Sequence, residues 1–309
     1  MPKKAKFVFD NMKKEDKKKG FTLVMTFSRR WCIHNFFATF LKMDLDMENI
    51  HLLIFDNTDN ALIEKDLMYW VEALKEAFLS TRLWKSYSRG VDRLIIDADI
   101  GFKGSKLPFI YKMQEDIIKL VHTDIFVQLE DDTLAPPKAV TKLVKILKTH
   151  KNCGVATAIE TGRSQDPWAK TRLGVHYIKM KGHMLIERLS LSPHHKGHVK
   201  VEGCGFYCFA TYTNIWREAF KKMPADMDNI PRFAMDNIFT NKIYQMGFDI
   251  IADFSLWCAH MNIAQTIIIF WGKKQAIKMA DLWIPKYKTY AQGIMLHDNL
   301  DPVNKERFP

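Results

Sequence analysis

In the first half of the chain, continuous apolar runs alternate with segments whose apolar residues have helical spacing. Four runs rich in Val, Ile, Leu and Phe predict buried strands, and they cover residues 21–27, 50–55, 93–97 and 124–129. Between them, apolar residues three and four positions apart predict helices over 31–43, 61–79 and 108–121. Strands of this kind that alternate with helices predict a parallel sheet covered on both faces. Polar residues follow the strands, so we expect them at the sheet edge where α/β folds bind ligands.

The second half of the chain has a less regular pattern. Helices are expected at 138–148, after Pro136 and Pro137, and at 214–221 and 235–246. Shorter strands are expected near 153–157, 173–180, 184–189, 201–209 and 248–252. Most of 160–200 is expected to be loop, and we find no internal repeat. The fold class is therefore predicted to be α/β, with the regular part first.

The overall composition is that of a soluble globular protein. The chain has 309 residues, of which 47% are apolar and 26% are charged. No stretch reaches the roughly 20 apolar residues that a transmembrane helix needs. The chain has only five Cys, and an odd number so few in this length argues against a disulfide framework. We therefore expect a cytoplasmic protein.

The net charge of +11 favours anionic partners, such as nucleic acid, a phosphorylated ligand or an acidic membrane surface. Residues 1–20 hold eight Lys against three acidic residues, and little else there can pack. We therefore expect them to form a mobile basic tail. Because about half of the net charge lies in this segment, the charge argues only weakly for nucleic acid.

The strongest chemical signal is the run Glu130-Asp131-Asp132 after the fourth predicted strand. Three adjacent carboxylates repel one another, so a cation is expected there rather than a plain solvated turn. Hard oxygen ligands suit Mg²⁺ or Mn²⁺, usually shared with substrate phosphates.

Weaker signals lie at three other places. Asp56 and Asp59 follow the second strand, where Asx-turn chemistry is the plainer explanation. Asp236 opens a predicted helix, as a cap or as a general base. His260 follows an apolar stretch, where a packed core residue is the commoner outcome.

Together, these features resemble a glycosyltransferase of the A-type fold (GT-A), most similar to the family-2 inverting nucleotide-sugar group. The resemblance covers roughly residues 21–260. It implies a Rossmann-like mixed sheet with helices on both faces. It divides the chain into a basic flexible tail (1–20), a nucleotide-sugar-binding half (21–135), an acceptor-binding and catalytic half (136–262) and a C-terminal extension (263–309). The matching segments are 26–30, 54–59, 101–106, 130–132, 203–209, Asp236 and His260.

The same resemblance implies roles for single residues. Asp56 would contact uracil, and Asp236 would be the catalytic base, although Met235 replaces the acid that usually precedes it. The metal ligands would be Glu130, Asp132 and His260. The donor-binding residues would be Thr26, Ser28, Arg29, Asp56, Asp59, Lys106 and Asp131.

The reaction implied is transfer from a nucleoside diphosphate sugar, most simply a UDP-sugar, to an acceptor hydroxyl. A divalent Mn²⁺ or Mg²⁺ would offset the charge of the leaving diphosphate. Asp236 would deprotonate the acceptor as it attacks, which predicts inversion by a hexosyl- or pentosyltransferase. The acceptor stays open between a glycan or lipid-linked glycan, reached by peripheral membrane contact, a hydroxymethylated base in viral DNA, and a protein.

Two alternatives belong to other classes. A nucleotidyltransferase acting on a sugar phosphate would also gather carboxylates and a metal, but residues 27–30 lack the Gly of its phosphate loop. A non-catalytic basic nucleic-acid-binding protein would have no need of Glu130-Asp131-Asp132.

Other residues are interpreted as structural. His194, His195 and His198 lie beside Pro193 and Gly197, which favours a solvated loop over a zinc site. Cys204 and Cys208 are expected to pack in the core. The aromatic residues near the C-terminus form either an interfacial surface or packing for an extension; they are Trp271, Trp283, Tyr287 and Tyr290.

Overall fold

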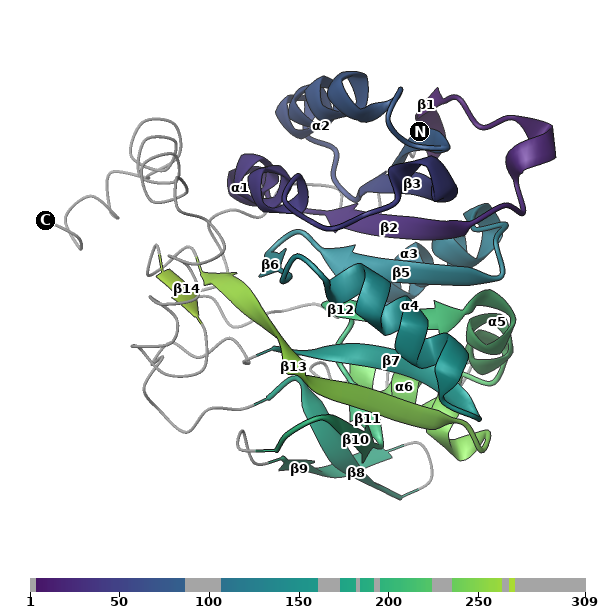
Figure 1. Ribbon diagram of the computed structural model, residues 1–309, viewed down its shortest axis with the longest axis vertical. Helices are drawn as coiled ribbons and strands as arrows, with labels where there is room; N and C mark the ends of the chain where they lie inside the picture. The colour runs from purple at the N-terminus through teal and green to yellow at the C-terminus, as the bar shows by residue number, and fades with distance from the viewer. Residues whose placement is uncertain are drawn as a thin grey trace, which may run out of the picture.

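The computed structural model describes residues 4–86, 107–160, 173–181, 184–191, 195–223, 235–262 and 267–269. Its centre is a sheet of eleven strands in the order β1-β4-β3-β2-β5-β12-β7-β13-β10, with β6 and β14 paired to β13 (Figure 1). A second sheet of three strands has the order β11-β8-β9.

Four parallel strands form the first half of the large sheet. They are β2 (Phe21–Phe27), β3 (Ile50–Asp56), β4 (Ser80–Lys85) and β5 (Ile125–Glu130). β2 lies between β3 and β5, and β4 lies outside β3. The carboxyl ends of all four strands therefore meet at one edge of the sheet, as the sequence predicts.

The second half of the large sheet is mixed. β12 (Cys208–Tyr212) runs antiparallel between β5 and β7 (Cys153–Glu160), and β13 (Asp249–Asn262) runs parallel to β7. β10 (His198–Val201) is antiparallel to β13. The remaining strands are β6 (Thr133–Leu134), β8 (Val175–Lys181), β9 (Met184–Ser190), β11 (Gly203–Cys204) and β14 (Ile267–Ile269).

Helices cover both faces of the sheet. α1 (Arg30–Phe40), α2 (Ala61–Leu74) and α4 (Ala139–Thr149) pack in one apolar core. α3 (Leu107–Leu120), α5 (Thr213–Lys221) and α6 (Met235–Gln245) pack in the other. In Figure 1, α4 lies in front of the sheet and α6 behind it.

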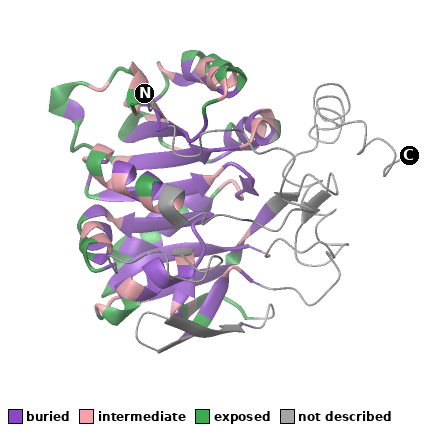
Figure 2. Ribbon diagram, turned by 180° about the vertical axis from the view of Figure 1, so that it is seen from behind, coloured by how far each residue is buried: buried purple, intermediate pink, exposed green. Residues whose placement is uncertain are grey.

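Alternation along the strands explains why the sheet needs two covers. In β2, Leu23 and Met25 face the core of α1, α2 and α4, whereas Val24 faces the other core. All three are fully buried, because successive side chains of a strand point to opposite faces. Figure 2 shows the result, with buried strands between helices that carry the exposed residues. The continuous apolar runs of the sequence are thus strands buried on both sides.

Residues 4–20 do not form the mobile tail that the composition of the N-terminal segment predicts. β1 (Lys6–Asp10) pairs antiparallel with β4 as an edge strand of the sheet. Phe7 packs edge-on against Trp84, with 4.8 Å between ring centroids. The short 3-10 helix η1 (Lys14–Asp16) follows, and the main-chain carbonyl of Asp16 lies 3.0 Å from His51 Nε2. Phe7, Val8 and Phe9 thus supply packing that outweighs the surrounding charge.

Two further predictions need correction. The third parallel strand is Ser80–Lys85, and the run 93–97 that was predicted for this role lies outside the described residues. The strand expected at 248–252 extends from Asp249 to Asn262. The predicted helices are confirmed to within a few residues, except that α2 ends at Leu74 rather than 79. Among the described residues, no helix combines the length and the apolar character needed to cross a membrane.

Candidate active site at the carboxyl edge of the sheet

Residues from the ends of four neighbouring strands lie side by side at the carboxyl edge. Phe27, the last residue of β2, pairs in register with Asp56, and Asp56 pairs with Lys85 at the end of β4. On the other side of β2, Thr26 pairs with Glu130 at the end of β5. The buried Thr26 accepts a main-chain hydrogen bond from Asp131 at 3.1 Å through its carbonyl. The parallel register thus joins the two acidic segments of the sequence in one site.

Asp131 is fixed by the turn between β2 and α1. Its Oδ2 accepts hydrogen bonds from the main-chain N–H groups of Ser28 at 2.7 Å and Arg29 at 2.9 Å. The Ser28 hydroxyl lies 3.4 Å from the same oxygen. Asp131 is buried, so these contacts satisfy a carboxylate that water does not reach. Asp131 therefore braces the turn.

The Arg29 guanidinium lies against two of the three clustered acids. Its Nη1 forms an ion pair with Asp131 and lies 3.2 Å from Asp132 Oδ2. Burial lowers the pKa of Arg29, but the charges of Asp131 and Asp132 outweigh burial and hold that pKa well above its ordinary value. The mutual repulsion of the carboxylates is thus partly offset by this chain's own cation.

Asp132 and Glu130 are the carboxylates best placed for a divalent cation. Asp132 is buried beside Arg29, and Glu130 is half-buried at the end of β5. Thr133, the next residue, donates a hydrogen bond to Glu160 Oε1 at 2.7 Å, so a further buried carboxylate lies close by. Within the described ranges, no three His, Cys, Asp or Glu side chains form a metal-binding group. An ion here would need ligands beyond those side chains, such as substrate phosphates and water.

The backbone of His260 lies next to this turn. Residue 260 of β13 pairs in register with Thr133 of β6, the residue that follows Asp132. The side chain of His260 is outside the described part of the structure. The prediction that this residue joins the metal site is therefore consistent with the strand register and stays a prediction.

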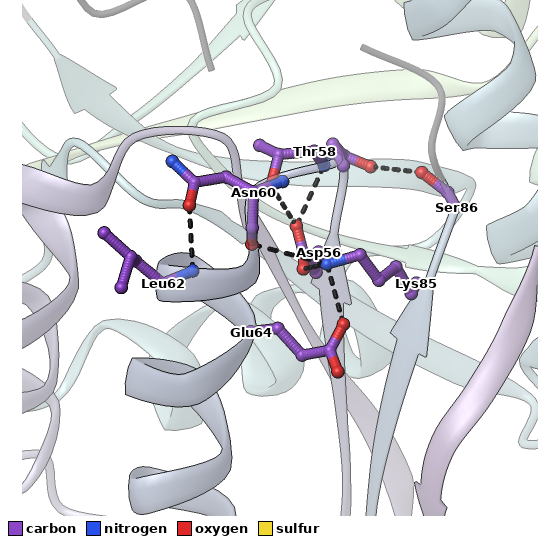
Figure 3. A network of polar contacts seen from close by, with 8 residues as sticks. Asp56, Thr58, Asn60, Leu62, Glu64, Lys85 and Ser86 are labelled. Atoms are coloured by element: carbon purple, nitrogen blue, oxygen red, sulfur yellow. Dashed lines mark hydrogen bonds and ion pairs between the residues drawn. The ribbon is translucent and has the colours of Figure 1, made fainter. Parts of the chain in front are cut away.

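Asp56 stands at the centre of a buried polar network (Figure 3). Its Oδ1 accepts hydrogen bonds from the main-chain N–H of Thr58 at 2.8 Å and from the Thr58 hydroxyl at 2.7 Å. Its Oδ2 lies 2.7 Å from Lys85 Nζ, which also contacts Glu64 Oε2 at 2.8 Å. The segment after β3 therefore forms the Asx turn that we considered, and an ion pair in addition.

Burial acts against both charges of this ion pair. It raises the pKa of Asp56, although hydrogen bonds from Lys85 and Thr58 oppose that rise. It also acts to lower the pKa of Lys85, but the bonds to Asp56 and Glu64 outweigh it and raise that pKa. Lys85 is thus held as a cation in an almost fully buried position.

Asp236 opens α6 beside a glycine turn. Its Oδ1 accepts hydrogen bonds from the main-chain N–H of Asn237 at 2.8 Å and from Asn237 Nδ2 at 3.0 Å. A Cβ added to Gly205 would lie 3.2 Å from Asp236 Oδ2, so the carboxylate closely faces that glycine. Two residues further on, the Tyr207 carbonyl accepts a hydrogen bond from the main-chain N–H of Glu130 at 3.0 Å. This short chain of contacts brings α6 to the same region as the acidic turn.

The remaining predicted residues have simpler outcomes. Asp59 is exposed after the Asx turn, and Lys106 lies outside the described residues. Cys204 and Cys208 are buried core residues, as predicted, and burial raises the pKa of the Cys204 thiol to about 12. None of the five cysteines forms a disulfide.

Two residues of this region, Lys85 and Glu160, were not predicted from the sequence. Lys85 ends a strand in which Arg82 is also buried, and both charges argued against a strand. The local signal was weak, because Ser-Thr-Arg-Leu-Trp-Lys over residues 80–85 does not alternate apolar with polar residues. Glu160 ends β7, which was predicted to stop at residue 157. An acid directly after an apolar strand was the signal there, as it was for Glu130.

No family model matches the sequence, and no curated protein matches it either. Mannosyltransferase PcManGT from Pyrobaculum calidifontis, solved with GDP-Man and Mn²⁺, superposes with a TM-score of 0.50 at 11% identity, covering 94% of this chain and 68% of the other. GalNAc-T7, solved with UDP, GalNAc and Mn²⁺, gives a TM-score of 0.52 at 12% identity, covering 97% and 57%. This chain has the A-type glycosyltransferase fold. The predicted fold class is confirmed, and this chain spans little more than half of GalNAc-T7.

Proposed function

We propose that this chain is a metal-dependent glycosyltransferase that moves a sugar from a nucleoside diphosphate sugar to an acceptor hydroxyl. The observation that carries the proposal is the acidic turn Glu130-Asp131-Asp132, which the end of β2 holds at the carboxyl edge of the sheet. The fold supports it, because both comparison structures with this fold hold Mn²⁺ and a nucleotide.

The donor set suits Mn²⁺ or Mg²⁺. Carboxylate oxygens are the ligands that these ions prefer, and they commonly share the ion with phosphates. Asp132 and Glu130 would hold the ion, with His260 as a further ligand. When bound, it would offset the negative charge of the nucleoside diphosphate that leaves. Arg29 adds a second positive charge beside the same carboxylates, and with Ser28 it forms the turn that would face the donor.

We further propose that the nucleotide is uridine and that Asp56 accepts a hydrogen bond from its base. A carboxylate offers about four lone-pair positions. The described bonds from Thr58 and Lys85 account for three of them at Asp56. Lys85 would keep Asp56 ionised, so that the carboxylate acts as an acceptor toward the N–H group of uracil. A base that presents only acceptors at that position would be disfavoured.

Asp236 is the base in this proposal. Asn237 holds one carboxylate oxygen, and the other lies close to Gly205, where any side chain would collide with Tyr207. Asp236 would take the proton of the acceptor hydroxyl while the new carbon–oxygen bond forms and the sugar–phosphate bond breaks. A single displacement of this kind inverts the anomeric centre, whether the sugar is a hexose or a pentose.

The acceptor that we propose is a glycan hydroxyl. The Lys-rich run 13–19 contacts His51 and therefore lies near the start of β3, whereas the candidate site lies at the end of that strand. A strand of seven residues spans roughly 20 Å. A DNA acceptor would favour positive charge beside the reacting edge, and this Lys-rich run lies at the other end of β3.

A donor panel tests the function. The purified chain would be incubated with UDP- and GDP-sugars and Mn²⁺, with an oligosaccharide or hydroxymethylated DNA as acceptor. We expect release of UDP that EDTA abolishes and that Asp132→Asn lowers strongly. Release of pyrophosphate would indicate a nucleotidyltransferase. Absence of both turnover and nucleotide binding by calorimetry would contradict the proposal.

A further inference from the structure

Two histidines far apart in the sequence meet at the opposite edge of the sheet. His150 caps the carboxyl end of α4, and His198 opens the edge strand β10. The Nε2 atom of His150 lies 2.8 Å from Nδ1 of His198. The ring centroids are 4.8 Å apart, with planes inclined by 63°. His198 is 41% exposed, so water reaches the pair.

A buried carboxylate stands behind this pair. Asp253 of β13 pairs in register with His198, and its Oδ2 lies 3.8 Å from His198 Nε2. Its Oδ1 accepts a hydrogen bond from the main-chain N–H of Ser255 at 2.8 Å, which fixes the carboxylate. An acid on this side favours the proton on Nε2 and leaves the Nδ1 lone pair directed at His150. Such carboxylate–histidine pairs commonly orient metal-binding imidazoles.

We propose that His150 and His198 form a binding site for a transition metal ion that prefers imidazole, such as Zn²⁺, Cu²⁺ or Ni²⁺. A tetrahedral ion with metal–nitrogen distances of about 2.0–2.1 Å needs its two nitrogens roughly 3.3 Å apart. The two nitrogens already lie 2.8 Å apart, so a small outward movement of the rings admits the ion. His150 gives up the hydrogen on Nε2 and takes a proton on Nδ1 instead, so the neutral ring changes tautomer and both facing nitrogens offer lone pairs.

Water completes the coordination shell of this site. Asp253 faces the far nitrogen of His198, so it orients that ring and does not bind the same ion. This agrees with the finding that no three such side chains form a metal-binding group within the described ranges. The end of α4 helps, because the partial negative charge at a helix carboxyl end favours a cation. Lys200 on the same strand is paired with Asp249 at 2.8 Å, which offsets its charge.

The site is separate from the carboxylate site in place and in chemistry. His150 precedes the first residue of β7, and Glu160 ends that strand near the acidic turn. The carboxylate site offers oxygen ligands for Mn²⁺ or Mg²⁺, whereas the histidine pair offers nitrogen. A bound ion would link α4 to the edge strand β10. It would therefore stabilise the native fold in proportion to its affinity. The inference does not depend on the proposed glycosyltransferase activity.

Copper and zinc titrations test the site. In an Asp132→Asn background, which weakens the carboxylate site, we expect one equivalent of Cu²⁺ with nitrogen hyperfine structure from two imidazoles in electron paramagnetic resonance. We also expect Zn²⁺ to raise the melting temperature. His150→Gln or His198→Gln should abolish both signals, and His195→Gln, three residues away and exposed, should keep them. Asp253→Asn should weaken Zn²⁺ binding about tenfold to a hundredfold.

Two results would overturn the proposal. One is unchanged copper hyperfine structure in both His150→Gln and His198→Gln, which would place the nitrogen ligands elsewhere. The other is loss of the signal in His195→Gln alone. Circular dichroism of each variant guards against misfolding, and because both rings reach the surface we expect native spectra.

Discussion

Arg29 contacts Asp131 through two different groups, its main-chain N–H and its guanidinium. The same guanidinium nitrogen lies 3.2 Å from Asp132. One arginine therefore fixes the first carboxylate and neutralises part of the charge of the second. These two neighbouring acids have the same residue type and different environments, so they should respond differently to the same substitution.

Asp131→Asn should destabilise the fold, whereas Asp132→Asn should mainly weaken metal binding. Asp131 is buried and accepts hydrogen bonds from both residue 28 and residue 29, so losing its charge leaves Arg29 poorly paired. We expect a loss of about 3 kcal/mol in the free energy of unfolding for Asp131→Asn. Urea unfolding and Mn²⁺ titration of both variants check this. Equal stability losses would contradict the division of roles.

Asp236→Asn should abolish transfer and preserve donor binding. The substitution keeps the shape and the contact with Asn237 but removes the proton acceptor. A general base contributes about a hundredfold to ten-thousandfold to kcat. Turnover and UDP affinity would be measured together, with the exposed Glu72→Gln on α2 as the control. Retained activity, or a product that keeps the donor's anomeric configuration, would exclude the base role.

The parallel half of the sheet was predictable from the sequence, because strands buried on both faces need continuous apolar runs. β2, β3 and β5 are of this kind, and their polar ends located Asp56 and Asp132. β4 was missed because Arg82 and Lys85 are buried in it, and pattern analysis treats such charges as exposed. Each charge has a partner from a distant segment: Arg82 donates to the Leu120 carbonyl and Lys85 binds Asp56. Tertiary partners of this kind cannot be derived from local spacing.

Lys85→Met should be strongly destabilising, and a second substitution should restore part of the loss. Without Lys85, the charge of Asp56 is buried with only Thr58 to satisfy it. Breaking a buried ion pair at one partner costs about 3–5 kcal/mol. Adding Asp56→Asn removes the stranded charge, so the double variant should be more stable than Lys85→Met. A double-mutant cycle by urea unfolding measures this coupling. Additive losses would show that the two residues act independently.

Removing the packing of β1 should lower the free energy of unfolding. If this segment were a mobile tail, the same change would have no effect. Phe7 stacks edge-on against Trp84 and lies under the guanidinium of Arg82, at 5.8 Å from the ring centroid. Phe7→Ala should cost about 1–2 kcal/mol, from a lost aromatic pair and partly buried surface. Lys4→Ala in the same segment is the control, because Lys4 is exposed. Unchanged thermal unfolding in Phe7→Ala would restore the interpretation as a tail.

Acid should weaken the attachment of the N-terminal segment through His51. This ring is buried between the Asp16 carbonyl and the Ser80 hydroxyl, and burial is the main reason that its pKa is lowered from 6.5. A base with a lowered folded-state pKa stabilises the fold above its unfolded pKa. That stability is lost as the pH falls from about 6.5 toward the folded value, by up to about 1.4 kcal/mol per pH unit.

Urea unfolding between pH 7.5 and 5.5 measures this slope. His51→Gln should reduce the slope of the free energy of unfolding against pH. Burial also lowers the pKa of His122, so this residue adds its own contribution of the same sign. His122→Gln should therefore remove only that contribution and keep the one from His51. The hydrogen bond to the Asp16 carbonyl favours the protonated ring, but burial disfavours its charge more, so acid favours states in which water reaches His51. Proteolysis within residues 1–20 should therefore rise over the same pH range. If His51→Gln leaves the slope unchanged, other groups cause the acid sensitivity, and His51 does not control the attachment of the N-terminal segment.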